Sequence, residues 1–212
     1  MHTVKAALIA STLVALSGCS GDGELLATGV RATRSACPSV AIPAATGDVT
    51  VFNPPSSRDA RAIDVVANIT NLRSTCDETG ANIVTNATFE VQGQRRDATG
   101  DREVVLQYFA TVVQGGNNVV SKRIGRVALR FANGQLRAST RGTATGQVLR
   151  SAATLPDDVR RQITRERKPG DADAALDPLA DPTVRAAVTR ASFEFLVGFQ
   201  LTPEQLAYNA TR

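Results

Sequence analysis

A period of two in the apolar side chains constrains this chain more than any other feature. From residue 60 to residue 148, and again over residues 191–201, apolar residues alternate with polar ones in long runs. Successive side chains of a β-strand point to opposite faces, so this pattern predicts half-buried strands. The apolar phase comprises Ile63, Val65, Ala67 and Ile69; Ile83, Thr85, Ala87, Phe89 and Val91; Leu136, Ala138, Thr140, Ala144 and Val148; and Ala191, Phe193, Phe195, Val197, Phe199 and Leu201.

A continuous apolar run and several turns extend the predicted sheet. Residues 104–113 are apolar in both phases, as in a central strand, and residues 38–43 can add a short edge strand. The apolar phase changes within residues 119–131 at Gly125, which predicts a β-bulge there. Turn sequences rich in Gly, Asn and Asp separate consecutive strands at residues 97–100, 115–118 and 133–134.

These strands predict a mainly β fold. About six or seven antiparallel strands in a body of this size favour an antiparallel β-sandwich, immunoglobulin- or fibronectin-like, with a small barrel as the alternative. We see no internal repeat, so we expect residues 37–212 to form a single β-sandwich domain.

Helical signals appear only in the last third of the chain. An apolar residue at every fourth position predicts a helical insertion over residues 156–168, and a second helical turn is expected at 184–188. Thr202 followed by Gln205 forms a capping box, which predicts a short C-terminal helix over residues 203–208.

The last predicted strand carries three of the seven Phe residues on one face, Phe193, Phe195 and Phe199. The chain has no Trp, so aromatic burial depends on Phe, and each buried ring contributes about 1.5–3 kcal/mol. We therefore expect a closing strand in the core. An exposed aromatic stripe, which would mark a partner or membrane contact, is the alternative.

The N-terminus has the form of a secretory signal. A charged start with Lys5 precedes an apolar run over residues 6–16, which is too short to span a bilayer. Small residues follow, ending at Cys19. The sequence Leu16-Ser17-Gly18-Cys19 resembles the lipobox of bacterial lipoproteins, in which the Cys is acylated and the chain is cut before it.

This resemblance implies an address and an anchor. It makes residues 1–18 a signal peptide, Cys19 the lipid attachment site and residues 19–36 a lipidated flexible tether. Several acyl chains anchor a protein stably to a membrane. In this family an Asp directly after the Cys retains the protein in the inner membrane, whereas Ser20 stands here. The resemblance therefore implies the outer membrane of a Gram-negative cell, facing the periplasm.

Two cysteines remain once Cys19 carries lipid. Cys37 and Cys76 are an even pair in an oxidising compartment, so we predict a disulfide between them. Two unpaired buried thiols are the alternative.

Composition excludes several kinds of chemistry. The one His and the one Met are His2 and Met1, inside the predicted signal peptide, so the mature chain has no His-based catalytic centre and no His-ligated metal. No motif for a catalytic nucleophile or a phosphate loop occurs, and we expect no cofactor. An Asp series over residues 171–181 has a spacing that calcium could use, but capping roles explain it as well. The net charge of +4 does not suggest nucleic acid.

Two functions from different classes remain. Arg160, Arg161, Arg165, Arg167 and Lys168 would place a basic face on the predicted helical insertion, a contact for anionic partners or simply a solvated surface. We expect a binding or scaffolding module of the cell envelope, whose exposed strand edges could accept a partner strand, and leave its oligomeric state open. The alternative is a carbohydrate-acting enzyme or a peptidoglycan-binding protein that uses acidic residues, and the enzyme would need a cleft with two carboxylates.

Overall fold

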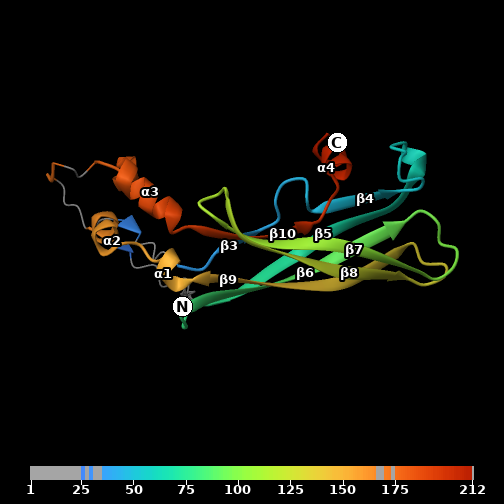
Figure 1. Ribbon diagram of the computed structural model, residues 1–212, viewed down its shortest axis with the longest axis horizontal. Helices are drawn as coiled ribbons and strands as arrows, with labels where there is room; N and C mark the ends of the chain where they lie inside the picture. The colour runs from blue at the N-terminus through green and yellow to red at the C-terminus, as the bar shows by residue number, and fades with distance from the viewer. Residues whose placement is uncertain (1–24, 27–28, 31–34, 166–169, 173–174, 212) are drawn as a thin grey trace, which may run out of the picture.

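Two four-stranded sheets face each other in the computed structural model, which describes residues 25–26, 29–30, 35–165, 170–172 and 175–211 (Figure 1). One sheet has the strand order β3-β10-β7-β8 and the other β4-β5-β6-β9. The strands are β3 (Ser39–Ala41), β4 (Asp48–Phe52), β5 (Ile63–Asp77), β6 (Asn82–Arg95), β7 (Arg102–Gln114), β8 (Asn118–Phe131), β9 (Arg137–Leu149) and β10 (Phe193–Phe199).

The strand order confirms the predicted mainly β sandwich. Strands β4, β5 and β6 follow one another in one sheet and β7 and β8 in the other, while β9 returns to pair with β6 and β10 returns to pair with β7. All these pairs are antiparallel, and only β3 lies parallel to its neighbour β10. The sandwich thus has eight strands rather than six or seven, because the five-residue β4 was not predicted.

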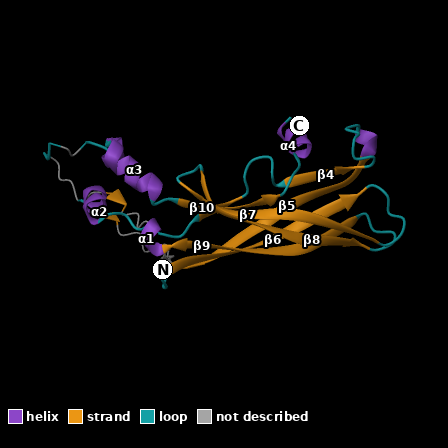
Figure 2. Ribbon diagram, in the orientation of Figure 1, coloured by secondary structure: helices purple, strands orange, loops and turns teal. Residues whose placement is uncertain are grey.

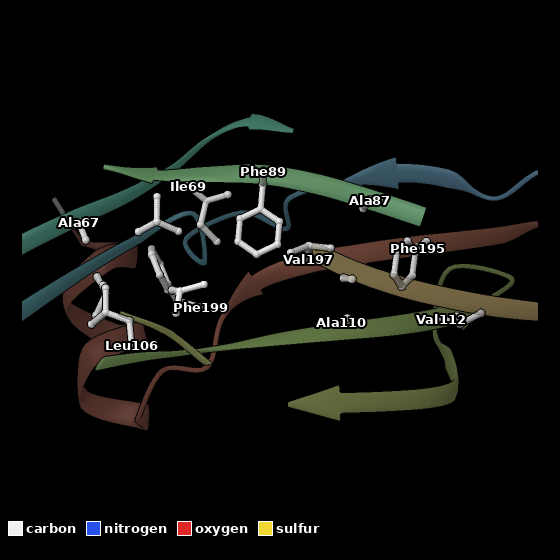
Figure 3. Packing of buried hydrophobic residues seen from close by; sticks show 14 of the residues in the cluster. Ala67, Ile69, Ala87, Phe89, Leu106, Ala110, Val112, Phe195, Val197 and Phe199 are labelled. Atoms are coloured by element: carbon white, nitrogen blue, oxygen red, sulfur yellow. The ribbon is translucent and has the colours of Figure 1, made fainter. Parts of the chain in front are cut away.

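The inner faces of the sheets form one apolar core. Phe89 from β6 and Phe195, Val197 and Phe199 from β10 meet between the layers, with Leu106 from β7 beneath them (Figure 3). The rings of Phe195 and Phe199 are each 1 % exposed, and β10 lies inside its sheet between β3 and β7. The prediction that this strand closes the core is confirmed, and its phenylalanines are not a surface stripe.

Glycines make room for aromatic rings on the inner faces. A Cβ atom on Gly142 would lie 2.2 Å from the ring of Phe89, and one on Gly125 would lie 2.2 Å from Cζ of Tyr108. Strand β8 pairs with β7 through Gly125 without interruption, and the register shifts instead between Val112 and Val113. The bulge predicted at Gly125 is therefore wrong: this glycine is required by the close ring of Tyr108, not by a backbone irregularity.

One buried cation, Arg95, joins two loops at one end of the sandwich. Arg95, on the inner face of β6, is 1 % exposed and its guanidinium lies 5.3 Å from the ring centre of Phe131. It donates four hydrogen bonds of 2.7–3.0 Å to backbone carbonyls in the β6–β7 and β8–β9 loops. The accepting carbonyls are those of Ala98, Gly100, Ala132 and Gln135.

The helices between β9 and β10 gather beyond one end of the sandwich (Figure 2). Between β9 and β10 lie α1 (Arg150–Ala153), α2 (Asp157–Thr164), a 3-10 turn (Pro178–Ala180) and α3 (Pro182–Arg190). Val159, Val184 and Ala187 form a small second core between α2 and α3. The expected turn at 184–188 is thus part of a full helix, whereas the expected helix over 156–168 ends at Thr164, because Arg165 has extended backbone angles.

The remaining elements confirm two local predictions. The C-terminal helix α4 (Pro203–Ala210) begins with the capping box of Thr202 and Gln205. A disulfide joins Cys37 to Cys76, and it ties the segment before β3 to the end of β5 in the opposite sheet. In the segment expected to be a flexible tether, β1 (Leu25–Leu26) and β2 (Gly29–Val30) form a short antiparallel pair. A second 3-10 turn, Ala60–Ala62, precedes β5.

Candidate functional site: the open edge of strand β8

The sandwich has four sheet edges, and they differ in how they are protected. Strand β3 is only three residues long. Strand β4 is covered by α4, because the side-chain amide of Asn209 donates to the carbonyls of Ala45 and Asp48, and Tyr208 packs edge-on against Phe52. Strands β8 and β9, with 14 and 13 residues, are long edges that pair on one side only. An unpaired strand edge offers N–H and C=O groups to another strand.

The first half of β8 is exposed on both faces. All seven residues from Asn118 to Ile124 are exposed, although the second half of the strand buries Val127, Leu129 and Phe131 in the core. Three of the exposed residues are large and apolar: Val119 is 59 %, Val120 51 % and Ile124 51 % exposed. Exposed apolar residues gathered on an edge strand are typical of a binding surface.

The register of the β7–β8 pair explains this exposure. Ser121 pairs with Val112 and Val119 pairs with Val113, so Val120 is an extra residue in β8. Such a bulge increases the local twist and turns the strand away from a flat sheet. Ser121 and Arg123 share the phase of the buried Val127 yet remain exposed, so the opposite sheet does not cover this half of β8.

Cations dominate the same side of the sandwich. Residues 104–156, which include β8 and β9, contain no Asp or Glu. Only two ion pairs between described residues reach these strands: Arg130 lies 2.8 Å from Glu103, and Arg141 lies 3.9 Å from Glu90. The Lys122 ammonium instead lies over the ring of Phe109, 5.3 Å from its centre. The cations of this stretch are Lys122, Arg123, Arg126, Arg130, Arg137, Arg141 and Arg150.

The outer face of β9 differs from that of β8. Arg137, Ser139, Arg141, Thr143, Thr145 and Gln147 all point outward and are exposed, and Leu149 at the end of the strand is the one apolar residue of this phase. Thr145 donates to the side chain of Asn86 on the neighbouring β6. A polar face with such cross-strand bonds is well solvated without a partner. The mixed apolar and basic composition of β8 makes it the stronger candidate of the two open edges.

Two shallow hollows adjoin β4, away from the β8–β9 side. The larger, about 460 Å³, lies between β4, the 55–58 loop and the start of α4, and Arg58 and Glu204 are its charged residues. The pKa of Glu204 lies below its ordinary value because a backbone N–H bonds to the carboxylate. The smaller hollow, about 260 Å³, is lined by apolar and Gln side chains. Neither brings two carboxylates together, the arrangement that a carbohydrate-cleaving enzyme needs.

The structure places the residues proposed from sequence as follows. Cys19, the expected lipid site, lies outside the described residues, as do Arg167 and Lys168. Of the expected basic helix face, Arg160 and Arg161 lie exposed on α2, and Arg160 pairs with Asp157 at 2.7 Å.

Arg165 follows the end of α2, so the described residues do not assemble the full basic face. In the Asp series, Asp177 and Asp181 cap the 3-10 turn and α3 by accepting from backbone N–H groups. No group of three or more His, Cys, Asp or Glu in the described part of the chain is placed to hold a metal ion.

Sequence reasoning missed β8 as the candidate site, although a signal was present. The 53 residues from 104 to 156 carry seven cations and no carboxylate, a charge segregation that periodicity alone does not reveal. Comparison with known protein families, curated proteins and solved structures finds no match for this chain. Among the described residues, no helix is both long and apolar enough to cross a bilayer.

Proposed function

We propose that this protein is a lipid-anchored binding module of the Gram-negative outer membrane, facing the periplasm, that takes a partner strand onto the edge of β8. The observation that carries the proposal is the first half of β8, an unpaired edge with Val119, Val120 and Ile124 exposed. An extended segment added there gains backbone hydrogen bonds to β8 and apolar contacts with these side chains. The lipobox at residues 16–19 supports the location.

The rest of the sandwich serves as a rigid support in this proposal. The other long edge, β9, is polar from Arg137 to Gln147 and exposes a single apolar residue, Leu149, at its end, and α4 covers the edge of β4. Strand β8 pairs with β7 from Asn118 to Phe131, apart from the bulged Val120, and this pairing holds its free side in a fixed conformation. A partner therefore meets a preformed edge, which lowers the entropic cost of binding.

Position-dependent photo-crosslinking in living cells tests this function. A photoreactive amino acid replaces Ser121 on β8 or, as a matched control, Thr88 on the outer face of β6, in the full-length lipoprotein; both positions are exposed. We expect one discrete adduct from position 121 and none from position 88. Absence of any adduct at 121, or the same adduct from both positions, would contradict the proposal.

The anchor has its own test. Cys19→Ser removes the thiol that the lipobox resemblance assigns to acylation. We expect this variant to incorporate no radiolabelled palmitate and to remain an uncut precursor or a free periplasmic protein. Equal palmitate incorporation by the variant and the wild type would refute lipid attachment at Cys19.

A further inference from the structure

We infer that the segment bound by β8 is acidic: an extended strand of a partner protein whose carboxylates lie beside Lys122, Arg123 and Arg126. This inference rests on the function proposed above and specifies the chemistry of the partner. It follows from the side-chain order along the edge, from the repulsion between two copies of β8 paired about Ile124, and from the separation of charges in the fold.

The side-chain order along β8 defines a complementary pattern. Lys122, Ile124 and Arg126 alternate with the buried phase and share the outer face, while Arg123 lies on the inner phase and is nevertheless exposed. Directly opposed residues of neighbouring strands share a face. A fitting strand therefore places carboxylates opposite Lys122 and Arg126, an apolar residue opposite Ile124, and a third carboxylate opposite Arg123.

The same charges oppose pairing of two β8 strands centred on Ile124. If two β8 strands paired antiparallel about Ile124, Lys122 of one chain would face Arg126 of the other. Like charges directly opposite one another destabilise a strand pair. Basic side chains on an edge also discourage unspecific sheet extension, and an acidic strand avoids this repulsion.

Charge separation within the fold makes these cations available to a partner. The nearest Asp or Glu along the chain are Glu103 and Asp157, and Glu103 is engaged by Arg130. Opposite charges across an interface accelerate encounter and fix the register of docking. Because an added strand must also satisfy backbone groups of β8, the edge favours an extended peptide over an anionic polymer such as a phosphate-rich glycan.

Three synthetic probes test the inference with the full-length mature protein in detergent. The first is a capped ten-residue peptide with Glu at the three positions facing the cations, Val facing Ile124 and Thr elsewhere. The second and third replace the three Glu by Gln or by Lys. The readouts are the dissociation constant at low and high salt and the hydrogen exchange of β8 backbone amides.

We expect the Glu peptide to bind about ten-fold more tightly than the Gln peptide, and the Lys peptide not to bind. Bound Glu peptide should slow exchange of alternate β8 amides. The variant Lys122→Gln/Arg123→Gln/Arg126→Gln should lose the preference for Glu over Gln. The control Arg137→Gln/Arg141→Gln/Arg150→Gln, which removes as many cations from the β9 side, should keep it.

Other outcomes overturn the inference. Binding of the Glu peptide without slower exchange in β8 would indicate a diffuse polyanion surface, and equal binding of the Lys peptide would remove the role of charge. A crosslinked partner whose captured segment has no Asp or Glu would refute the acidic strand and leave the proposed function standing. Absence of any partner at β8 in cells would refute both.

Discussion

At the scale of single residues, Arg95 shows how one side chain can organise two loops. Its planar guanidinium presents five N–H donors in a fixed fork, and four bonds to carbonyls of both loops use most of them. No carboxylate is among these partners, so the charge is stabilised by backbone dipoles and by the ring of Phe131.

We predict that Arg95→Met lowers the free energy of unfolding by about 3–5 kcal/mol, because it removes all four hydrogen bonds by which the buried guanidinium joins the two loops. Arg95→Lys should also lose most of this stability, since an ammonium cannot reproduce the fork. Urea denaturation measures both effects, and Arg96→Met is the matched control because Arg96 is exposed. A variant at position 95 as stable as the position-96 control would contradict this account.

A second residue-scale prediction concerns pH. Arg102 bonds to both carboxylate oxygens of Asp64, at 2.7 and 2.5 Å, and these bonds hold the pKa of Asp64 below its ordinary value, against the opposing effect of burial. A carboxyl whose pKa is lower in the folded state adds stability above its unfolded pKa of about 4. That stability is lost as the pH falls below this value towards the folded pKa.

Because Arg102 is partly exposed, solvent screening limits this contribution to about 1 kcal/mol or less. Between pH 7 and pH 3, wild-type protein should therefore lose more unfolding free energy than Asp64→Asn, by at most that amount. Urea titrations of both proteins at the two pH values provide the comparison. An equal loss in the two proteins would mean that Asp64 does not contribute to acid sensitivity.

At the scale of elements, period-two alternation predicted the strands well because each strand buries one face. It placed β5, β6, β9 and β10 and assigned the phenylalanines of β10 to the core. It failed where contacts between strands decide the outcome. Position 125 requires glycine because the ring of Tyr108 on the adjacent strand leaves no room for a Cβ atom. The exposure of β8 depends on which parts of the strand the opposite sheet covers.

The pairing of glycine with an aromatic ring on a neighbouring strand gives an element-scale prediction. Gly142→Ala should lower the unfolding free energy by about 1–3 kcal/mol, because its Cβ would overlap the buried ring of Phe89. Thr143→Ala, one residue along β9 and facing solvent, is the control and should cost less than about 1 kcal/mol. Thermal or urea unfolding would contradict the account if the two substitutions had the same effect.

At the scale of the molecule, the disulfide joins the two sheets. Cys37 precedes β3, a three-residue edge strand, and Cys76 lies near the end of β5, 39 residues later in the chain. A strand this short has few contacts of its own, so the covalent link holds it beside β10.

We predict that Cys37→Ser/Cys76→Ser destabilises the protein by up to about 4 kcal/mol, the loop-closure entropy of such a bridge. Hydrogen exchange should show the largest loss of protection in β3 and at its contact with β10. Unchanged stability, together with unchanged protection of β3, would show that the sheets hold together without the bridge.

The central claim for the whole molecule is that β8 is occupied by a partner in the cell envelope. The most direct measurement is maleimide labelling of Val119→Cys in intact cells and in purified protein, with Leu149→Cys on β9 as control; the native side chains are 59 % and 61 % exposed. With the edge about 90 % occupied, Val119→Cys should react about ten-fold more slowly in cells than after purification, relative to Leu149→Cys. The same ratio of the two labelling rates in cells and in purified protein would contradict the claim.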